Sequence, residues 1–137
     1  MTINFTEKII AHSGVKSLKP KVNGGVEIDI SAAKSSEATT LTVDELVDQC
    51  VAVDSSTGVA LTLPSPASIL QKLKSMGDNV SLTDEYEFNI LIIDATAPTT
   101  IAVPEGGTSY IDEMTTTGKK SIFLKFTDLT TPTYIVY

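Results

Sequence analysis

Few residues in this chain have the chemistry of a catalytic or metal-binding site. The 137-residue sequence contains one cysteine, Cys50, and one histidine, His12. A lone cysteine forms neither an internal disulfide nor a multi-thiolate metal site. A catalytic thiol needs a base beside it, and nothing in the sequence places His12 there. We therefore interpret Cys50, within the apolar stretch CVAV, as a small buried hydrophobic residue.

Closely spaced carboxylates are the second candidate for chemistry, because paired acids carry out glycoside hydrolysis. One group is Glu27 with Asp29, and the other comprises Asp84, Glu85 and Glu87. Acidic residues at alternate positions of a strand more commonly form its solvated face. The sequence also has no phosphate-binding glycine loop and no metal-ligand spacing. We therefore predict a protein that is not an enzyme and has no cofactor or metal.

Charge is unevenly distributed along the chain, whose formal net charge is −7. Residues 1–34 hold five lysines and three acidic residues, whereas residues 35–137 hold five lysines and fourteen acidic residues. Arginine, the residue best suited to bidentate contacts with phosphates and base edges, is absent. These features argue against nucleic-acid binding. Apolar runs of about four residues also argue against a membrane span, and the first ten residues do not resemble a signal peptide.

Local patterns divide the chain into an extended leading segment, 1–38, and a β-rich body, 39–137. In the leading segment, Val26–Ile30 alternates apolar and acidic residues, which predicts one strand. In the body, Thr42 and Glu45 fit a capping box that opens a short helix. We find no tandem repeat, and threonine is abundant throughout.

The middle of the body predicts a hairpin followed by a helix. Two strands, CVAVD and VALTL, flank the glycine-containing turn SSTG. Next, Ser65 is a suitable N-cap, Pro66 a suitable first helical residue and Gly77 a suitable left-handed C-cap. The helix has an apolar stripe that we expect to cover the sheet. This stripe consists of Ile69, Leu70, Leu73 and Met76.

The strongest strand prediction is Tyr86–Asp94, which we expect to be central and covered on both sides because both of its faces carry apolar residues. Shorter strands are predicted at Thr99–Val103, at Ser121–Thr127 and through Tyr137. Strands at spacings of about ten residues predict a mostly β fold. We expect an antiparallel β-sandwich of jelly-roll type, or a small barrel, with one packed α-helix near residues 65–76.

The order of these motifs resembles a family of small phage and virus structural proteins that serve as head decoration, cement or fibre-type components. The shared motifs are a strand ending in LTLP, a helix opened by Ser-Pro, the strand FNILIID, the strand TIAV before a glycine-containing loop, and a closing strand pair. The resemblance covers Leu41–Tyr137 but not residues 1–38. The chain departs from the pattern at Asp94 and Pro98, and its last strand lacks the arginines of many relatives.

The resemblance implies a virion structural protein that is made in the host cytoplasm and binds the outer capsid surface. Its partners would be the major capsid protein and further copies of the same chain, in a homotrimer, without nucleic acid or membrane. The bound protein would stabilise the shell. The leading segment would supply the capsid contact. The candidate contact residues are Phe5, Ile9, Ile10, Val15 and Leu18.

The alternative is a host-attachment or fibre-type module that binds a cell-surface glycan or receptor. Loops at one end of the fold, Asp54–Gly58 and Pro104–Tyr110, would then form the contact. The candidate contact residues in the second loop are Glu105, Gly106, Gly107 and Tyr110. Tyrosines 110, 134 and 137 either line such a contact or are sheet residues with a polar tip, and we favour the sheet role.

Overall fold

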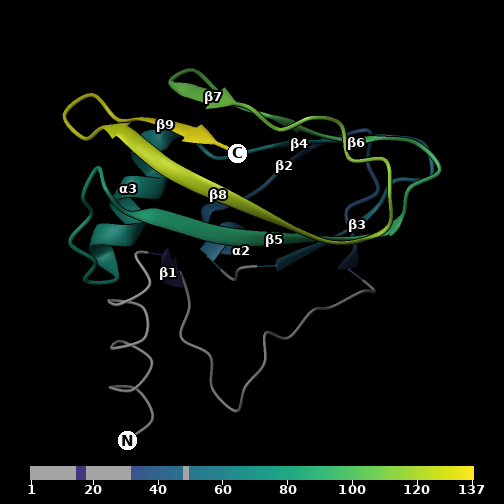
Figure 1. The fold of residues 1–137 in the computed structure, drawn as a ribbon, viewed down its shortest axis with the longest axis horizontal. Helices are drawn as coiled ribbons and strands as arrows, with labels where there is room; N and C mark the ends of the chain where they lie inside the picture. Colours follow the sequence, from purple (N-terminus) through teal and green to yellow (C-terminus); the bar gives the residue numbers. More distant parts are fainter. Residues whose placement is uncertain (1–14, 18–31, 48–49) are drawn as a thin grey trace, which may run out of the picture.

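The computed structural model describes residues 15–17, 32–47 and 50–137. These residues form two β-sheets that pack face to face through one apolar core, with a helix at one end (Figure 1). The predicted mostly β fold class with one packed helix is confirmed, and the described strands do not close into a barrel. The strand predicted at Val26–Ile30 lies outside the described residues.

The large sheet is built around β5, which pairs in parallel with β1 and β3 along one edge and antiparallel with β8 along the other. Beyond β8 the sheet continues through β9 to β7. Its strands are β1 (Val15–Ser17), β3 (Cys50–Asp54), β5 (Glu85–Asp94), β7 (Gly107–Ser109), β8 (Gly118–Asp128) and β9 (Thr133–Val136).

The small sheet contains three strands in the order β2-β4-β6, all parallel. They are β2 (Ala38–Thr40), β4 (Val59–Thr62) and β6 (Thr99–Ala102). Five of the seven strand pairings in the described part of the chain are parallel. The mostly parallel strand pairing therefore differs from the antiparallel sandwich that we expected. The difference arises because the turns connect strands of opposite sheets.

The segment predicted as a hairpin is instead a β-arch, in which two consecutive strands belong to opposite sheets. β3 lies in the large sheet and β4 in the small one, and β5 and β6 form a second arch in the same way. The two arches stack in parallel, with Val59 opposite Thr99 and Asp54 opposite Asp94. The hairpin prediction was wrong because strand–turn–strand patterning is the same for both arrangements.

The stacked arches share a sequence pattern that we did not detect as a repeat. Residues 51–64 read VAVDSSTGVALTLP and residues 91–104 read LIIDATAPTTIAVP, so the aspartate and the final proline recur after 40 positions. A shorter third arch precedes them. Its Lys34 N–H donates to the Ala52 carbonyl at 2.8 Å, and its Glu37 carbonyl accepts from the Ala60 N–H at 2.8 Å. Each arch therefore bonds to its neighbour through the backbone, as in repeat proteins.

Ser55 joins the turns of the two main arches. Its N–H donates to the Asp94 carbonyl at 3.0 Å, and its carbonyl accepts from the Ala97 N–H at 2.8 Å. Its Oγ donates to the Pro98 carbonyl at 2.9 Å, and the residue is fully buried. The N–H, the carbonyl and the hydroxyl of Ser55 thus all form hydrogen bonds that connect the first arch to the second.

The helix after the first arch has the boundaries that its sequence predicts. It is α3 (Pro66–Ser75), and the Ser68 N–H donates to Oγ of its N-cap Ser65 at 3.3 Å. Gly77, with φ of +84°, ends it. The Gly77 N–H donates to the Lys74 carbonyl at 3.0 Å and the Asp78 N–H to the Leu73 carbonyl at 3.1 Å. These two bonds form a Schellman motif.

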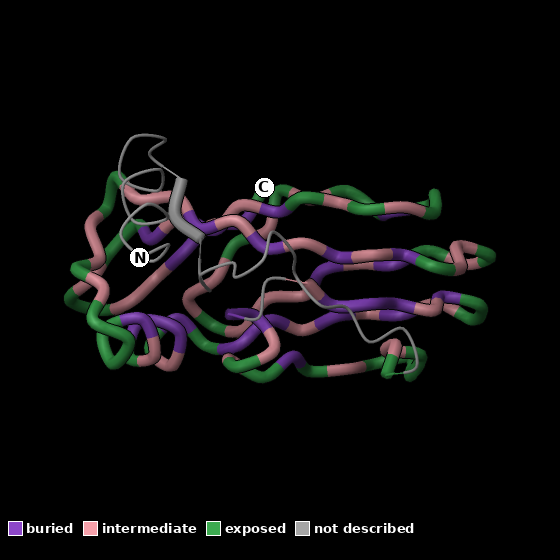
Figure 2. Tube along the Cα trace, turned by 90° about the horizontal axis from the view of Figure 1, so that it is seen from below, coloured by how far each residue is buried: buried purple, intermediate pink, exposed green. Residues whose placement is uncertain are grey.

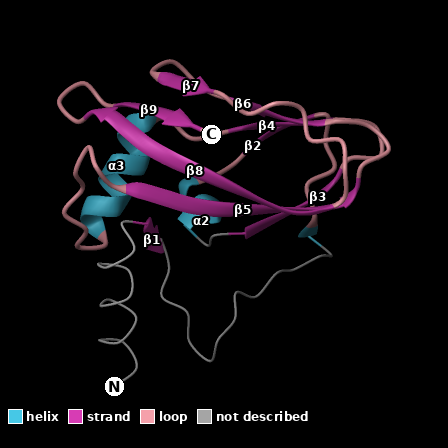
Figure 3. Ribbon diagram, in the orientation of Figure 1, coloured by secondary structure: helices cyan, strands magenta, loops and turns pink. Residues whose placement is uncertain are grey.

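Three of the four predicted stripe residues on α3 are buried, and the fourth is not. Ile69, Leu70 and Leu73 belong to the core. Met76 is 46% exposed because it is the C-cap residue, where the chain leaves the helix. Figure 3 shows α3 at the end of the sandwich away from the stacked arch turns. The helix therefore covers that end of the core, as predicted.

A second, shorter helix, α2 (Val43–Val47), begins with the predicted capping box. The Glu45 N–H donates to Thr42 Oγ1 at 3.1 Å, and the Thr42 N–H donates to Glu45 Oε1 at 3.2 Å. Lys34 Nζ lies 2.5 Å from Glu45 Oε2 and connects the third arch to α2. Partial burial raises the pKa of Glu45, but the hydrogen bonds from Lys34 and Thr42 outweigh it and leave that pKa below its ordinary value.

β5 is central, as predicted, and in the described part of the chain one of its faces is buried and the other is partly exposed. Tyr86, Phe88, Ile90 and Ile92 are buried in alternation, and Figure 2 shows the same alternation along neighbouring strands. Ile93, on the other side of the strand, is 38% exposed. Within the described residues, the small sheet and the helices pack against the inner face of the large sheet, so its outer face is a surface.

The stacking of the arches predicts that substitutions at two adjacent serines will have very different effects on the free energy of unfolding. Ser55→Ala removes the buried bond to Pro98 and should lower the free energy of unfolding by about 1–2 kcal/mol. Ser56→Ala, at an exposed position of the same turn, should change it by less than about 0.5 kcal/mol. Urea denaturation of both variants measures the difference. Equal stabilities would contradict the inter-arch role of Ser55.

The contacts of α3 predict that the same substitution will have very different effects on stability at a buried and at an exposed position of the apolar stripe. Leu73→Asp places an unpaired carboxylate in the core and should lower the free energy of unfolding by about 4 kcal/mol or more, because the charge loses its hydration. Met76→Asp introduces the same group at an exposed position and should have little effect. Circular dichroism with chemical denaturation tests both. A Leu73→Asp variant as stable as Met76→Asp would show that the stripe does not face the core.

Candidate functional site

The outer face of the large sheet carries a group of side chains that we call the aromatic platform: Phe123, Tyr137 and Glu85. Phe123 and Tyr137 exchange backbone hydrogen bonds, with N–H to carbonyl distances of 2.9 and 3.0 Å. Their rings stack with centroids 6.0 Å apart and planes 26° apart. The Tyr137 hydroxyl donates a hydrogen bond to Glu85 Oε1. The Tyr137 side chain thus extends from the end of β9 across β8 to β5 and is held at both ends.

The strand alternation places these side chains on the outer face. Ile122 and Leu124 are buried, so Phe123 between them points outward. Tyr86 and Phe88 are buried in the same way, so the acidic residues on either side of Tyr86, Glu85 and Glu87, also point outward. Glu87 lies directly opposite Phe123 in the β5–β8 register. The acidic group is thus a strand face, as the sequence indicated, although Glu85 is also engaged by Tyr137.

A polar row lies beside the platform on the same face. Ser121 Oγ donates to Asn89 Oδ1 at 3.0 Å, across the β5–β8 pairing. Cys50 is opposite Asn89 on β3. It is half-buried rather than buried as we predicted, because it lies on the outer face of the sheet. Partial burial raises the pKa of its thiol.

The hydrogen bond to Glu85 raises the pKa of Tyr137 above the ordinary value for tyrosine. The bond exists only while the phenol keeps its proton, and ionisation would bring two negative charges together. Tyr137 is nevertheless 41% exposed. The platform therefore presents a neutral, fixed aromatic ring to solvent at neutral pH.

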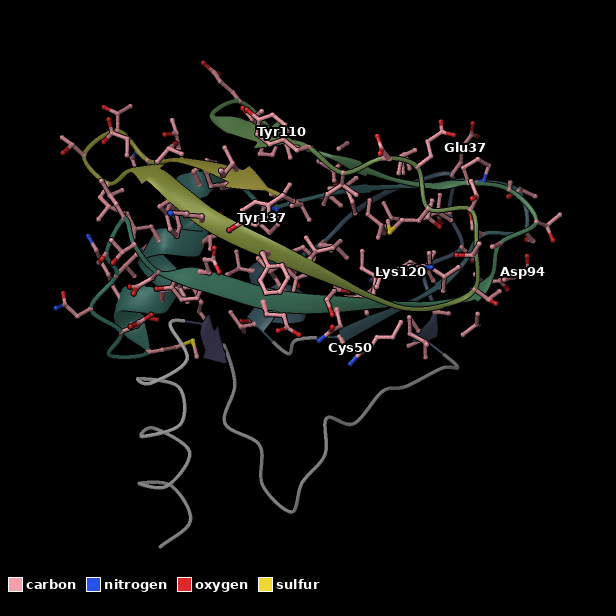
Figure 4. The ribbon with its side chains drawn as sticks, in the orientation of Figure 1. Glu37, Cys50, Asp94, Tyr110, Lys120 and Tyr137 are labelled. Atoms are coloured by element: carbon pink, nitrogen blue, oxygen red, sulfur yellow. The ribbon has the colours of Figure 1, made fainter. Side chains whose placement is uncertain are left out.

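The two loops expected to form a joint contact lie at opposite ends of the sandwich. Residues 54–58 precede β4, whereas residues 104–106 follow β6, and β4 and β6 run in parallel from one end to the other. The prediction of loops at a single end was therefore wrong, because the arch carries the chain across the sandwich. Tyr110, labelled in Figure 4, follows β7, and its N–H donates to the Val136 carbonyl at 2.9 Å, so its backbone lies beside the last strand near Tyr137.

Two of the four predicted loop residues have a packing role. A Cβ on Gly107 would lie 2.9 Å from atoms of Tyr134 and Val103, so only glycine fits. Gly106 has φ of +88°. Tyr134 itself is a core residue whose hydroxyl donates to the Pro64 carbonyl at 3.0 Å. The exposed positions of this loop and β7 are Glu105, Thr108 and Tyr110, the last of them 68% exposed.

Most of the residues proposed for the capsid contact lie outside the described residues. They are Phe5, Ile9, Ile10 and Leu18, and His12, Glu27 and Asp29 also lie outside. Val15 is in β1, whose backbone pairs in parallel with β5 at Glu85. The leading segment is therefore joined to one edge of the large sheet at this point.

Among residues 15–17, 32–47 and 50–137, no group of three or more His, Cys, Asp and Glu side chains is placed to hold a metal ion. No helix in that part of the chain has the length and apolar character needed to cross a membrane. No family model matches the sequence, and no curated protein or solved structure was found to match it.

The Tyr137–Glu85 bond predicts a specific titration behaviour. Glu85→Ala should lower the pKa of Tyr137 toward its ordinary value, because the phenol loses its acceptor and a nearby negative charge. Glu87→Ala removes the neighbouring carboxylate on the same face and should have a much smaller effect. NMR titration of the Tyr137 ring measures both. An unchanged Tyr137 pKa in Glu85→Ala would show that the bond does not form in solution.

Proposed function

We propose that this protein is a virion structural protein that decorates the outer capsid surface as a homotrimer and stabilises the shell. The observation that carries the proposal is the order of motifs that resembles decoration, cement and fibre-type proteins. In the fold, these motifs contribute to a single core. β4 is followed by Pro64, α3 opens on Ser65-Pro66, and β5, β6, β8 and β9 supply further buried residues.

The arrangement of the sandwich also supports the proposal. The leading segment has the more basic composition of the two parts of the chain, and its Val15–Ser17 pairs with the edge of β5. An arm joined at one edge of the large sheet can contact the capsid while the faces and the loop ends of the body stay accessible. In this proposal the leading segment binds the capsid, and the β-rich body is exposed on the particle surface.

The alternative proposal of a glycan-binding or receptor-binding loop cluster has less support. Its two loops lie at opposite ends of the sandwich, and Gly106 and Gly107 pack against the fold. No contact surface shared by the two loops can therefore form on one copy of the chain. We keep decoration as the proposed function of the fold.

A matched pair of variants tests the proposed anchor in the full chain. Phe5→Asp/Ile9→Asp adds two charges to the leading segment and should reduce binding to purified capsids stripped of this protein by at least about tenfold, because carboxylates would have to be desolvated at the contact. Met76→Asp/Leu82→Asp adds the same two charges at body positions that are each 46% exposed and should bind normally. Co-sedimentation measures the bound fraction.

Two further measurements bear on the same proposal. Light scattering of the isolated protein should give a mass three times that of one chain, and quantified particles should hold many copies of it. Equal capsid binding by both double variants would contradict the anchoring role of the leading segment. A handful of copies per particle would contradict decoration and favour a fibre.

A further inference from the structure

We propose that the aromatic platform and the polar row beside it form a binding site for a neutral glycan. The site lies on the outer face of β5, β8 and β9, at the opposite end of β5 from the Asp54–Gly58 turn. It adjoins the proposed anchor where Val15 pairs with Glu85, but it does not depend on the decoration function. Three features of the face carry the inference: a fixed ring, adjacent hydrogen-bonding groups and the local charge.

The first feature is the ring of Tyr137. It stacks on Phe123, its hydroxyl bonds Glu85, and its backbone pairs with Phe123, so the side chain has little freedom to lose on binding. A sugar ring has one face made largely of C–H groups, and such a face packs against the π-face of an aromatic ring. A rigid aromatic ring that is 41% exposed on a sheet is suited to this contact.

The second feature is the set of hydrogen-bonding groups next to the rings. Glu87, directly opposite Phe123, supplies a carboxylate that accepts bonds from two neighbouring hydroxyls. Asn89 accepts from Ser121 Oγ through Oδ1, an orientation that leaves its amide nitrogen as a donor. Because Glu87 and Asn89 both point outward from β5, an acceptor and a donor lie side by side. The hydroxyls of a sugar both donate and accept, so they can satisfy both groups.

The third feature is charge, which selects among possible ligands. Two carboxylates, Glu85 and Glu87, lie by the rings. Among the described residues, Lys125 lies on the same face of β8, and Lys119 lies near Cys50 at the far end of the polar row. Residues 35–137 carry fourteen acidic residues against five lysines. An anionic ligand such as a sialylated glycan or a nucleic acid would be disfavoured next to Glu85 and Glu87 at the rings. A neutral sugar makes the stacking and hydroxyl contacts without that penalty.

A glycan array that contains neutral and sialylated oligosaccharides tests the proposal with the isolated full-length protein. We expect binding to one or more neutral glycans and not to their sialylated forms. Isothermal titration with the strongest neutral oligosaccharide should then show at least about tenfold weaker binding for Tyr137→Ala. Asn89→Asp, which keeps the side-chain shape but replaces the amide donor by a carboxylate, should weaken binding similarly. Met76→Ala, at an exposed position at the end of α3, should bind as the unmodified protein does.

Each other result would overturn the proposal. Absence of binding to any neutral glycan, or preference for sialylated ones, would exclude the ligand class. Binding that survives Tyr137→Ala but is lost in Met76→Ala would place the site at the end of α3. A change in oligomeric mass in Tyr137→Ala or Asn89→Asp would show that a second copy of the chain covers the face. These assays use no capsids, so their outcome is independent of the decoration proposal.

Discussion

The stacking of the β-arches is the constraint on which the rest of the structure depends. The backbone bonds at Ser55 fix the turn of the first arch against the second, and they set the parallel registers of β3 with β5 and of β4 with β6. On the other edge of β5, β8 pairs antiparallel with β5, and β9 pairs antiparallel with β8. The positions of Glu85, Phe123 and Tyr137 on the outer face follow from those registers.

Local features of this fold were predictable because neighbouring residues determine them. The capping box at Thr42 and Glu45 and the caps of α3 at Ser65 and Gly77 each involve residues within a few positions of one another. The β-arches were not predicted, because the alternation in CVAVD and VALTL fits a hairpin equally well. The 40-residue repetition of the arch sequence was the signal that distinguishes the two. Positions 40 residues apart pair with each other at Asp54 and Asp94 and along β4 and β6, whereas β3 before its register shift pairs with β5 at an offset of 39.

The candidate site was predictable only in part, for a related reason. The sequence indicated that alternate acidic residues would face solvent, and that tyrosines of the last strands would keep a polar tip. It did not indicate that Tyr137 reaches Glu85, which is 52 positions away. That contact requires three strands in a particular register, and the register depends on long-range pairing rather than on local pattern.

The same geometry separates two kinds of interaction on one small sandwich. The inner faces of the sheets pack together in the core, and β1 of the leading segment pairs with the edge of β5 near Glu85. The platform occupies the outer face, where the stacked rings and the bond to Glu85 hold it without any contribution from the loops. A protein built in this way can be held to a surface through its leading segment while its outer sheet face binds a ligand. The two proposed roles adjoin where Val15 pairs with Glu85, whereas Tyr137 and Asn89 lie outside the register of β1, so substitutions at these two residues should affect the ligand alone.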